Sequence, residues 1–270
     1  MTKGDFLYHL THSKAALKTI TLIPGETYYF FLQDIAKTLH ISVFKLFSQY
    51  ANQAYKKDGN IIANTYSLPL GMKENELIGY LLNVSNKRYQ HFSKKIFGFY
   101  DKKRWYRYVT IASIIQKEAA SKQEMPLIAS VIYNRLEKNM KLQMDGTLNY
   151  GKYSHTIVTP KMIRENRTSY NTYKNKGIPT DPVCAIEMEA LKAAIFPAKT
   201  DYLYFVKSID GKKHIFRNSF KKHKKYIKKI KKYKKKKTRK QKFTKSIKRK
   251  KIHYKKPHIS KKNRLKTLWK

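Results

Sequence analysis

The 270-residue sequence is poor in several residue types, and each shortage excludes a class of protein or site. A single cysteine, Cys184, means that no disulfide can form within the chain. No run of roughly 18 apolar residues is present, so no segment has the pattern of a membrane-spanning helix. The glycine motifs of phosphate loops, dinucleotide-binding turns and nucleophile elbows are also missing. Asp and Glu number only 17 against 60 Lys and Arg, which gives a net charge of +43.

The nine histidines show no metal-ligand spacing, so we expect neither a metal nor a cofactor. The first residues, 1–5, lack the basic and apolar regions of a signal peptide. Phe6, Leu7 and Leu10 form a helical stripe with no cap before it, as in the interior of a domain. Together with the membrane anchor that the family resemblance described below implies, these features predict that the gene product begins upstream of Met1, with export by another route as the alternative.

A single glutamate ends an apolar helical stripe near the middle of the chain. At 3.6 residues per turn, Ile111, Ile114, Ile115 and Glu118 share one face of a predicted helix. Burial disfavours the ionised form of a carboxyl group, so a glutamate on that face can remain protonated near neutral pH and donate a proton. The structural alternative is that the stripe ends one turn early and Glu118 pairs with Lys122.

An ordered series of motifs follows this helix. A second helix is predicted over residues 125–136, with Pro126 in its first turn. Then come LQMDGT at 142–147, YNTY at 170–173, GIP at 177–179 and a segment from PAK to YLYFV at 197–206. Their order and spacing over residues 111–223 resemble the catalytic domain of the endolytic murein transglycosylases, the YceG-like family.

The resemblance implies cleavage of the β-1,4 bond between N-acetylmuramic acid and N-acetylglucosamine within nascent glycan strands. The products would carry 1,6-anhydro ends, and strand elongation would stop. The family's essential acid falls on Glu118, while the position of a frequent second glutamate is Gln116 here. One carboxyl group can suffice because the muramyl 6-hydroxyl supplies the nucleophile, whereas a hydrolase normally uses two carboxylates.

Four further residues are candidates for substrate binding. Gln143, Asn171 and Tyr173 could bind acetamido and hydroxyl groups, and Asp145 could position the sugar or stabilise an oxocarbenium ion. The alternatives are structural, with Asp145 as a turn-forming residue and with Asn171 and Tyr173 in a turn.

Two positions depart from the family pattern. Gly146 stands where the family commonly has proline, and residues 180–184 replace a stretch rich in proline and glycine. We expect both changes to affect loop rigidity more than chemistry, because Gly and Pro solve different backbone problems in turns.

The periodicities predict an α+β fold in four parts. A strand at 17–23, helices at 28–39 and 42–55, and an extended segment at 61–68 make residues 1–72 similar to a LysM-like subdomain. The other parts are a helical connector at 73–106, a YceG-like mixed α/β catalytic domain at 107–225 and a Lys-rich tail at 226–270. The LysM-like unit would either bind glycan or only orient the catalytic domain.

The last 50 residues contain 24 Lys and 3 Arg and no acidic residue. Such a segment cannot bury enough apolar surface to fold alone, so we expect disorder beyond a helix at 220–233. Blocks of this kind bind polyanions, here anionic lipid or acidic wall polymers, unless the tail is an extension without a partner. Interleaved aromatic residues raise nucleic-acid binding as an alternative function, although the folded part lacks its known motifs. A catalytically inactive wall-binding scaffold is the other alternative.

The resemblance also implies a location and partners. We expect the protein in the inner membrane, held by an N-terminal anchor that is not part of this sequence, with the catalytic domain facing the periplasm. Expected partners are peptidoglycan glycan strands and peptidoglycan synthases of the penicillin-binding class.

Overall fold

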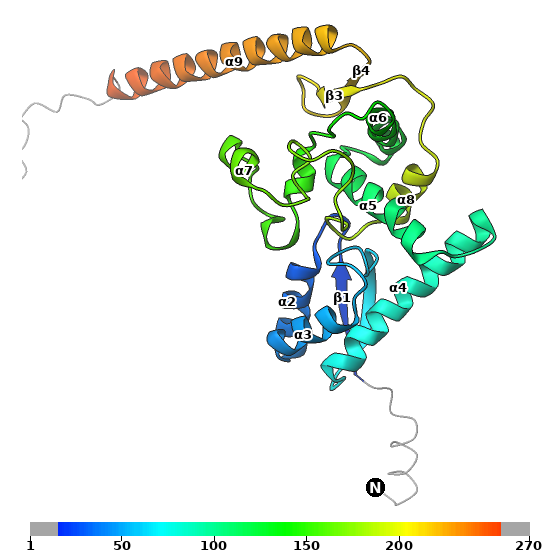
Figure 1. Cartoon of the computed structure of the whole chain (residues 1–270). Helices are drawn as coiled ribbons and strands as arrows, with labels where there is room; N and C mark the ends of the chain where they lie inside the picture. The colour runs from blue at the N-terminus through cyan, green and yellow to red at the C-terminus, as the bar shows by residue number, and fades with distance from the viewer. Residues whose placement is uncertain (1–15, 255–270) are drawn as a thin grey trace, which may run out of the picture.

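A computed structural model describes residues 16–254, with side chains for residues 16–236 and Thr238 (Figure 1). Its elements are β1 (Leu17–Leu22), α2 (Tyr28–Leu39), α3 (Val43–Gln53), β2 (Asn64–Pro69), α4 (Glu74–Phe97), α5 (Lys102–Glu118), η1 (Lys122–Glu124), α6 (Met125–Glu137), η2 (Asp145–Leu148), η3 (Gly151–Tyr153), α7 (Pro160–Glu165), α8 (Met188–Ile195), β3 (Tyr204–Lys207), β4 (His214–Arg217) and α9 (Phe220–Tyr254). The fold is mixed α/β, with the helices dominant. The apolar stripe at residues 6–10 lies outside the described residues.

The N-terminal unit is an antiparallel strand pair covered by two helices. β1 pairs with β2 from Leu17 opposite Pro69 to Leu22 opposite Asn64. Alternate strand residues face inward, and helix α2 adds apolar side chains from one face. The order strand, helix, helix, strand is as predicted, and α2 has the predicted bounds. The LysM-like assignment and the four-part division of the chain remain predictions.

The long helix α4 connects two clusters of buried apolar residues. Leu77, Ile78 and Leu81 belong to the cluster of the N-terminal unit. About two turns beyond Leu81, Tyr89 belongs to the second cluster, which lies mainly among α5, α6 and α8. Helix α4 therefore contributes to both cores along a single element.

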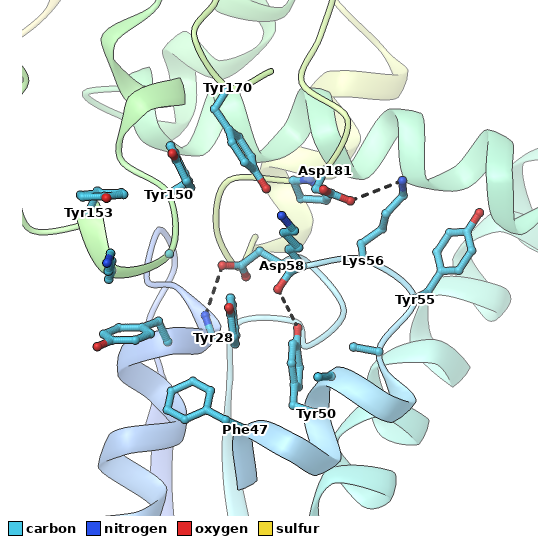
Figure 2. A pocket seen from close by; sticks show the side chains of 17 residues that line it. Tyr28, Phe47, Tyr50, Tyr55, Lys56, Asp58, Tyr150, Tyr153, Tyr170 and Asp181 are labelled. Atoms are coloured by element: carbon cyan, nitrogen blue, oxygen red, sulfur yellow. Dashed lines mark hydrogen bonds and ion pairs between the residues drawn. The ribbon is translucent and has the colours of Figure 1, made fainter. Parts of the chain in front are cut away.

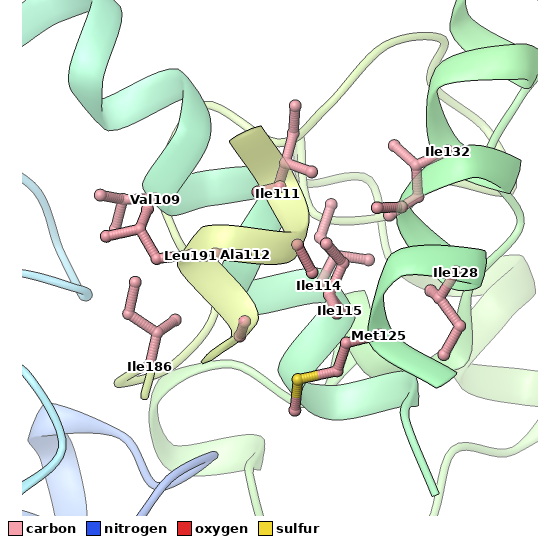
Figure 3. Close-up of a cluster of buried hydrophobic side chains, with 14 of the residues drawn as sticks. Val109, Ile111, Ala112, Ile114, Ile115, Met125, Ile128, Ile132, Ile186 and Leu191 are labelled. Carbon is pink, nitrogen blue, oxygen red and sulfur yellow. The ribbon is translucent and has the colours of Figure 1, made fainter. Parts of the chain in front are cut away.

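The second unit, which contains the predicted acid Glu118, is built around helix α5. Figure 3 shows its apolar side chains, among them Ile114 and Ile115, beside Ile128 and Ile132 of α6 and Leu191 of α8. All five side chains are fully buried. Because this packing fixes α5 along most of its length, it also fixes the position of Glu118, the last residue of the helix.

A short segment before α8 joins the two units by backbone hydrogen bonds. Gly25 N–H donates to the Ala185 carbonyl at 2.9 Å, and Ala185 N–H donates to the Glu26 carbonyl at 2.7 Å. Next to them, Ala63 N–H donates to the Ile186 carbonyl at 3.0 Å. Ala185 is buried in the N-terminal cluster and Ile186 in the second cluster, so this segment is shared by both cores.

The structure corrects the prediction that the Lys-rich tail (226–270) is disordered beyond residue 233. Helix α9 runs from Phe220 to Tyr254, well past the expected end at Tyr233. Lys and Arg are good helix formers, and residues 220–254 contain neither Gly nor Pro. Packing of the first turns against β3 and β4 supplies the nucleus from which the helix extends. The end of the predicted tail, 255–270, lies outside the described residues.

Candidate functional site

The predicted acid, Glu118, lies at a cavity of about 540 Å³ beside the C-terminus of α5. The β3–β4 hairpin and the start of α9 form one side of the cavity, and the segment from Leu142 to Asp145 forms another. The polar side chains that line it are those of Lys117, Glu118, Arg135, Gln143, Asp145, Tyr173, Tyr204, Lys207, His214 and His223.

The environment of Glu118 favours the protonated carboxyl group. Burial, together with the nearby charge of Asp145, raises its pKa to about 7. The N–H of Gly146, 2.7 Å from Oε1, and the charge of Lys207 oppose this shift. A glutamic acid with such a pKa can donate a proton at neutral pH and accept one again.

The alternative pairing of Glu118 with Lys122 is excluded by the structure. Lys122 instead forms an ion pair with Glu187, at 2.6 Å, and lies 3.8 Å from Glu189. Gln116 is also engaged elsewhere, because its Oε1 accepts the N–H of Glu187. Glu118 therefore faces the cavity without a basic partner from its own helix.

Three of the four candidate substrate-binding residues line the same cavity. The Tyr173 hydroxyl donates to Asp145 Oδ1 at 2.6 Å, so these two side chains form a fixed pair. Gln143 has a φ of 51°, in the left-handed region, and its N–H donates to the Thr172 carbonyl at 3.1 Å. This bond ties the 142–145 segment to the Tyr-Asn-Thr-Tyr motif.

Asn171 lies outside the cavity, which corrects its assignment as a substrate-binding candidate. The side chain is fully buried, and its Nδ2 donates to the carbonyls of Ile163 and Asn166, each at 2.8 Å. Its Oδ1 accepts the N–H of Tyr173 at 3.1 Å. With its amide fully engaged by backbone groups, Asn171 holds the turn that positions Tyr173.

Comparison with known proteins decides the family. A model described as the YceG-like family matches residues 1–229. This chain belongs to the YceG-like family. A crystal structure from Listeria monocytogenes described as yceG-like has a TM-score of 0.66 and 23% identity, and the match covers 83% of this chain and 81% of that one.

Two curated relatives of this YceG-like chain are named endolytic murein transglycosylase. The Bacillus subtilis (strain 168) protein is 40% identical over 122 residues, which is 44% of this chain and 33% of that protein. The Streptococcus pneumoniae serotype 2 (strain D39) protein is 29% identical over 226 residues, which is 82% of this chain and 39% of that protein. The chain thus spans about a third to two fifths of the length of these relatives.

Gly146 of this YceG-like chain lies against the acid itself. A Cβ atom at position 146 would stand 2.9 Å from Glu118 Oε1 and 2.6 Å from the Cβ of Lys117, both too close. Proline, common here in the family, would also lack the N–H that donates to Glu118. The expectation that Gly146 affects loop rigidity more than chemistry is therefore incomplete, because the residue also contacts the carboxyl group of Glu118.

Five basic residues of the cavity were not among the predicted site residues. Lys117 and Arg135 lie within the two predicted helices, Lys207 directly follows the YLYFV motif, and His214 and His223 come later in the chain. Arg135 donates to the carbonyls of Leu142 and Leu203, at 2.7 and 2.6 Å, and so ties two walls together. No local sequence pattern marks these residues as part of the site, because Lys207 and His214 come opposite each other only through the pairing of β3 with β4.

The cavity wall near His214 is anchored by two hydrogen bonds to the buried side chain of Glu124. Glu124 accepts the backbone N–H of His214 at 2.6 Å and contacts its Nδ1 at 2.8 Å. Burial raises the pKa of Glu124, but the bonds from His214 outweigh it and lower the pKa overall. Among residues 16–254, no three His, Cys, Asp or Glu side chains gather as metal ligands, and no helix there is long and apolar enough to cross a membrane.

Proposed function

We propose that this chain is an endolytic murein transglycosylase that uses Glu118 as its general acid and base. The observation that supports this most directly is the Glu118 carboxyl, with a pKa of about 7, at a polar cavity. The names of the curated relatives agree with this activity. Its bond would be the β-1,4 link between N-acetylmuramic acid and N-acetylglucosamine.

The proposed reaction needs one carboxyl group and no added water. Protonated Glu118 donates its proton to the glycosidic oxygen as the bond from that oxygen to C1 of the muramyl unit breaks. The resulting carboxylate then takes the proton of the muramyl 6-hydroxyl, and O6 bonds to C1. The product is a 1,6-anhydro ring, and Glu118 is protonated again, ready for the next cycle.

Neighbouring groups would support these two steps. The Gly146 N–H occupies Oε1, which leaves Oε2 of Glu118 to carry the proton. Asp145, held by Tyr173, supplies a fixed negative charge that favours the positive charge on the sugar ring in the transition state. Lys117, Arg135 and Lys207 give the cavity a positive lining suited to a substrate that carries carboxylates.

Digestion of purified murein, followed by mass spectrometry of the fragments, tests the activity. We expect ends with 1,6-anhydromuramic acid, whereas reducing ends would indicate a hydrolase and refute the proposal. Glu118→Gln should lower the rate by about 10²–10⁴-fold, the usual contribution of general acid catalysis. Glu165→Gln, an exposed residue of α7, is the matched control and should leave the rate unchanged.

The location and partners follow as part of the same proposal. Murein lies outside the cytoplasmic membrane, so the Glu118 cavity would face the cell wall and meet peptidoglycan synthases there. The basic helix α9 would contact anionic lipid headgroups, each Lys or Arg near the surface contributing about 1 kcal/mol. Cross-linking in cells that produce the protein, with and without synthase inhibitors, would test these contacts.

A further inference from the structure

A second cavity, of about 740 Å³, lies between the N-terminal and catalytic units and shares no lining residue with the Glu118 cavity. Tyr28 and Tyr50 stack on its N-terminal side, with ring centroids 4.8 Å apart and planes at 6°. Tyr150 and Tyr170 stack on its catalytic side, at 3.9 Å and 12°. Figure 2 shows Asp58 between these two tyrosine pairs.

Asp58 is a buried carboxyl group without a cationic partner in the described part of the chain. Its side chain accepts only backbone N–H groups, from Tyr28 at 3.2 Å and from Gly59 at 2.9 Å. The residue is 4% exposed. Buried charges in proteins are normally paired, so an unpaired carboxyl in a chain with 60 Lys and Arg is unusual.

Lys56, Lys117 and Glu26, which are charged groups near Asp58, are engaged with other partners, whereas Lys57 and Lys152 line the cavity without an ion pair to Asp58. Lys56 pairs with Asp181 at 3.4 Å, and its Nζ also donates to the Thr180 carbonyl at 2.9 Å. Lys117 Nζ donates to the Ser154 hydroxyl at 2.8 Å.

Glu26, whose negative charge also acts on Asp58, pairs with His155 at 2.8 Å. Burial raises the pKa of Asp58 to about 7, although its two N–H donors and Lys117 oppose the shift. A ligand cation beside this carboxyl would supply the missing partner.

We propose that this cavity binds a primary alkylammonium group, with Asp58 as its counter-ion and the tyrosine rings around its charge and methylene chain. Aromatic faces attract cations, and flat apolar walls suit the methylene groups of such a ligand. A neutral sugar would leave Asp58 without a counter-charge, and an anion would be repelled by it. An alkylammonium group matches both the tyrosine rings and the carboxyl group of Asp58 in this cavity.

We infer that the ammonium group comes from the peptide carried by murein, because the side chains of its diamino acids end in a primary amine. This source rests on the proposed function. Asp145 lines the Glu118 cavity and Tyr150 lines this one. Five residues span at most about 18 Å, so the two cavities are near enough for one peptide-bearing strand. Cleavage would then depend on the peptide as well as on the glycan.

Titration of the full-length protein with Nα-acetyl-lysine amide at pH 8, followed by NMR, tests the ammonium site. We expect saturable binding, at least tenfold weaker for the Nε-acetylated analogue and about thirtyfold weaker at pH 5.5, where a group of pKa 7 is mostly protonated. Equal binding of the acetylated analogue, or no saturable binding at pH 8, would overturn the proposal.

Variants separate the site from general surface binding. Asp58→Asn should abolish saturable binding. Tyr28→Leu retains the backbone N–H that donates to Asp58, and it should weaken binding by about two- to thirtyfold through loss of the aromatic face. Tyr80→Leu, an exposed residue of α4 outside the cavity, is the matched control. Unchanged binding in Tyr28→Leu would count against the site even if Asp58→Asn failed to fold.

Soluble murein fragments with free or acetylated amines test the source of the ligand, with the Glu118→Gln protein used to prevent cleavage. Tighter binding of the free-amine fragments, lost in the double variant with Asp58→Asn, supports the peptide as the source. Equal binding of both fragments refutes that source. Absence of cleavage by the natural sequence would refute the transglycosylase proposal and leave the lysine amide result unaffected.

Discussion

Gly146→Ala is expected to impair proton transfer by Glu118, although the substitution neither adds nor removes a charged group. The added Cβ would stand 2.6 Å from the Cβ of Lys117, whereas carbon atoms in contact are normally about 3.5–4.0 Å apart. The Cβ of Lys117 is fixed by the backbone of α5, so the 145–148 segment must move by about 1 Å. That movement breaks or lengthens the 2.7 Å bond from the Gly146 N–H to Glu118.

Two measurable changes follow from this movement. A misplacement of about 1 Å can reduce a rate by around 10²-fold, so murein digestion should slow by one to two orders of magnitude. The N–H of Gly146 lowers the pKa of Glu118, so its loss moves the fall in activity above pH 7 to higher pH. Overpacking should also lower the free energy of unfolding by about 1–3 kcal/mol.

The assay is the initial rate of murein digestion from pH 5 to pH 9, with thermal unfolding measured in parallel. Gly79→Ala in α4 is the matched control, because its Cβ would meet only the end of the Gln53 side chain at 3.4 Å. The reasoning is refuted if folded Gly146→Ala keeps the natural rate and the natural pH profile.

Three further predictions concern stability and charge. The raised pKa values of Glu118 and Asp58 mean that the folded protein binds more protons than the unfolded chain. The free energy of unfolding should therefore fall as the pH rises from about 4 to 7. In chemical denaturation, Glu118→Gln should raise that free energy by roughly 2–3 kcal/mol at pH 8 but change it little at pH 4. Asn171→Ala leaves three buried backbone groups unpaired and should cost about 2–3 kcal/mol in the same assay. Truncation after Tyr233 removes 19 basic residues. Binding to anionic vesicles should fall steeply while the rate of murein digestion stays unchanged. Vesicle binding equal to that of the full chain would contradict this prediction.

Local patterns in the sequence predicted the elements well. The bounds of α2 follow from its apolar spacing, and the helix that ends at Glu118 follows from the stripe of Ile111, Ile114 and Ile115. The role of Asp58 could not be predicted, because part of its surroundings comes from Tyr150 and Tyr170, which lie 92 and 112 residues further along the chain. Contacts over such separations depend on the packing of whole units, which periodicity does not encode.

The two failures have different physical causes. The tail was expected to be disordered because it cannot bury a core, but a helix needs only good helix formers and a nucleus, and Phe220 against Tyr204 is part of that nucleus. Asn171 was a candidate because amides bind sugars. Amides also satisfy buried carbonyl groups, and the sequence alone does not distinguish the two uses.

Helix α4 and the Ala185 segment have a consequence for how the molecule unfolds. Each contributes to both apolar clusters, so neither cluster can open without exposing part of the other. Heat should therefore melt the N-terminal unit and the second unit in one transition, and the amide protons of Leu81 and Tyr89 should exchange with solvent deuterium at similar, slow rates. We expect no site of rapid proteolytic cleavage near residue 73. An N-terminal unit produced separately would expose the apolar face that Ala185 covers in the full chain.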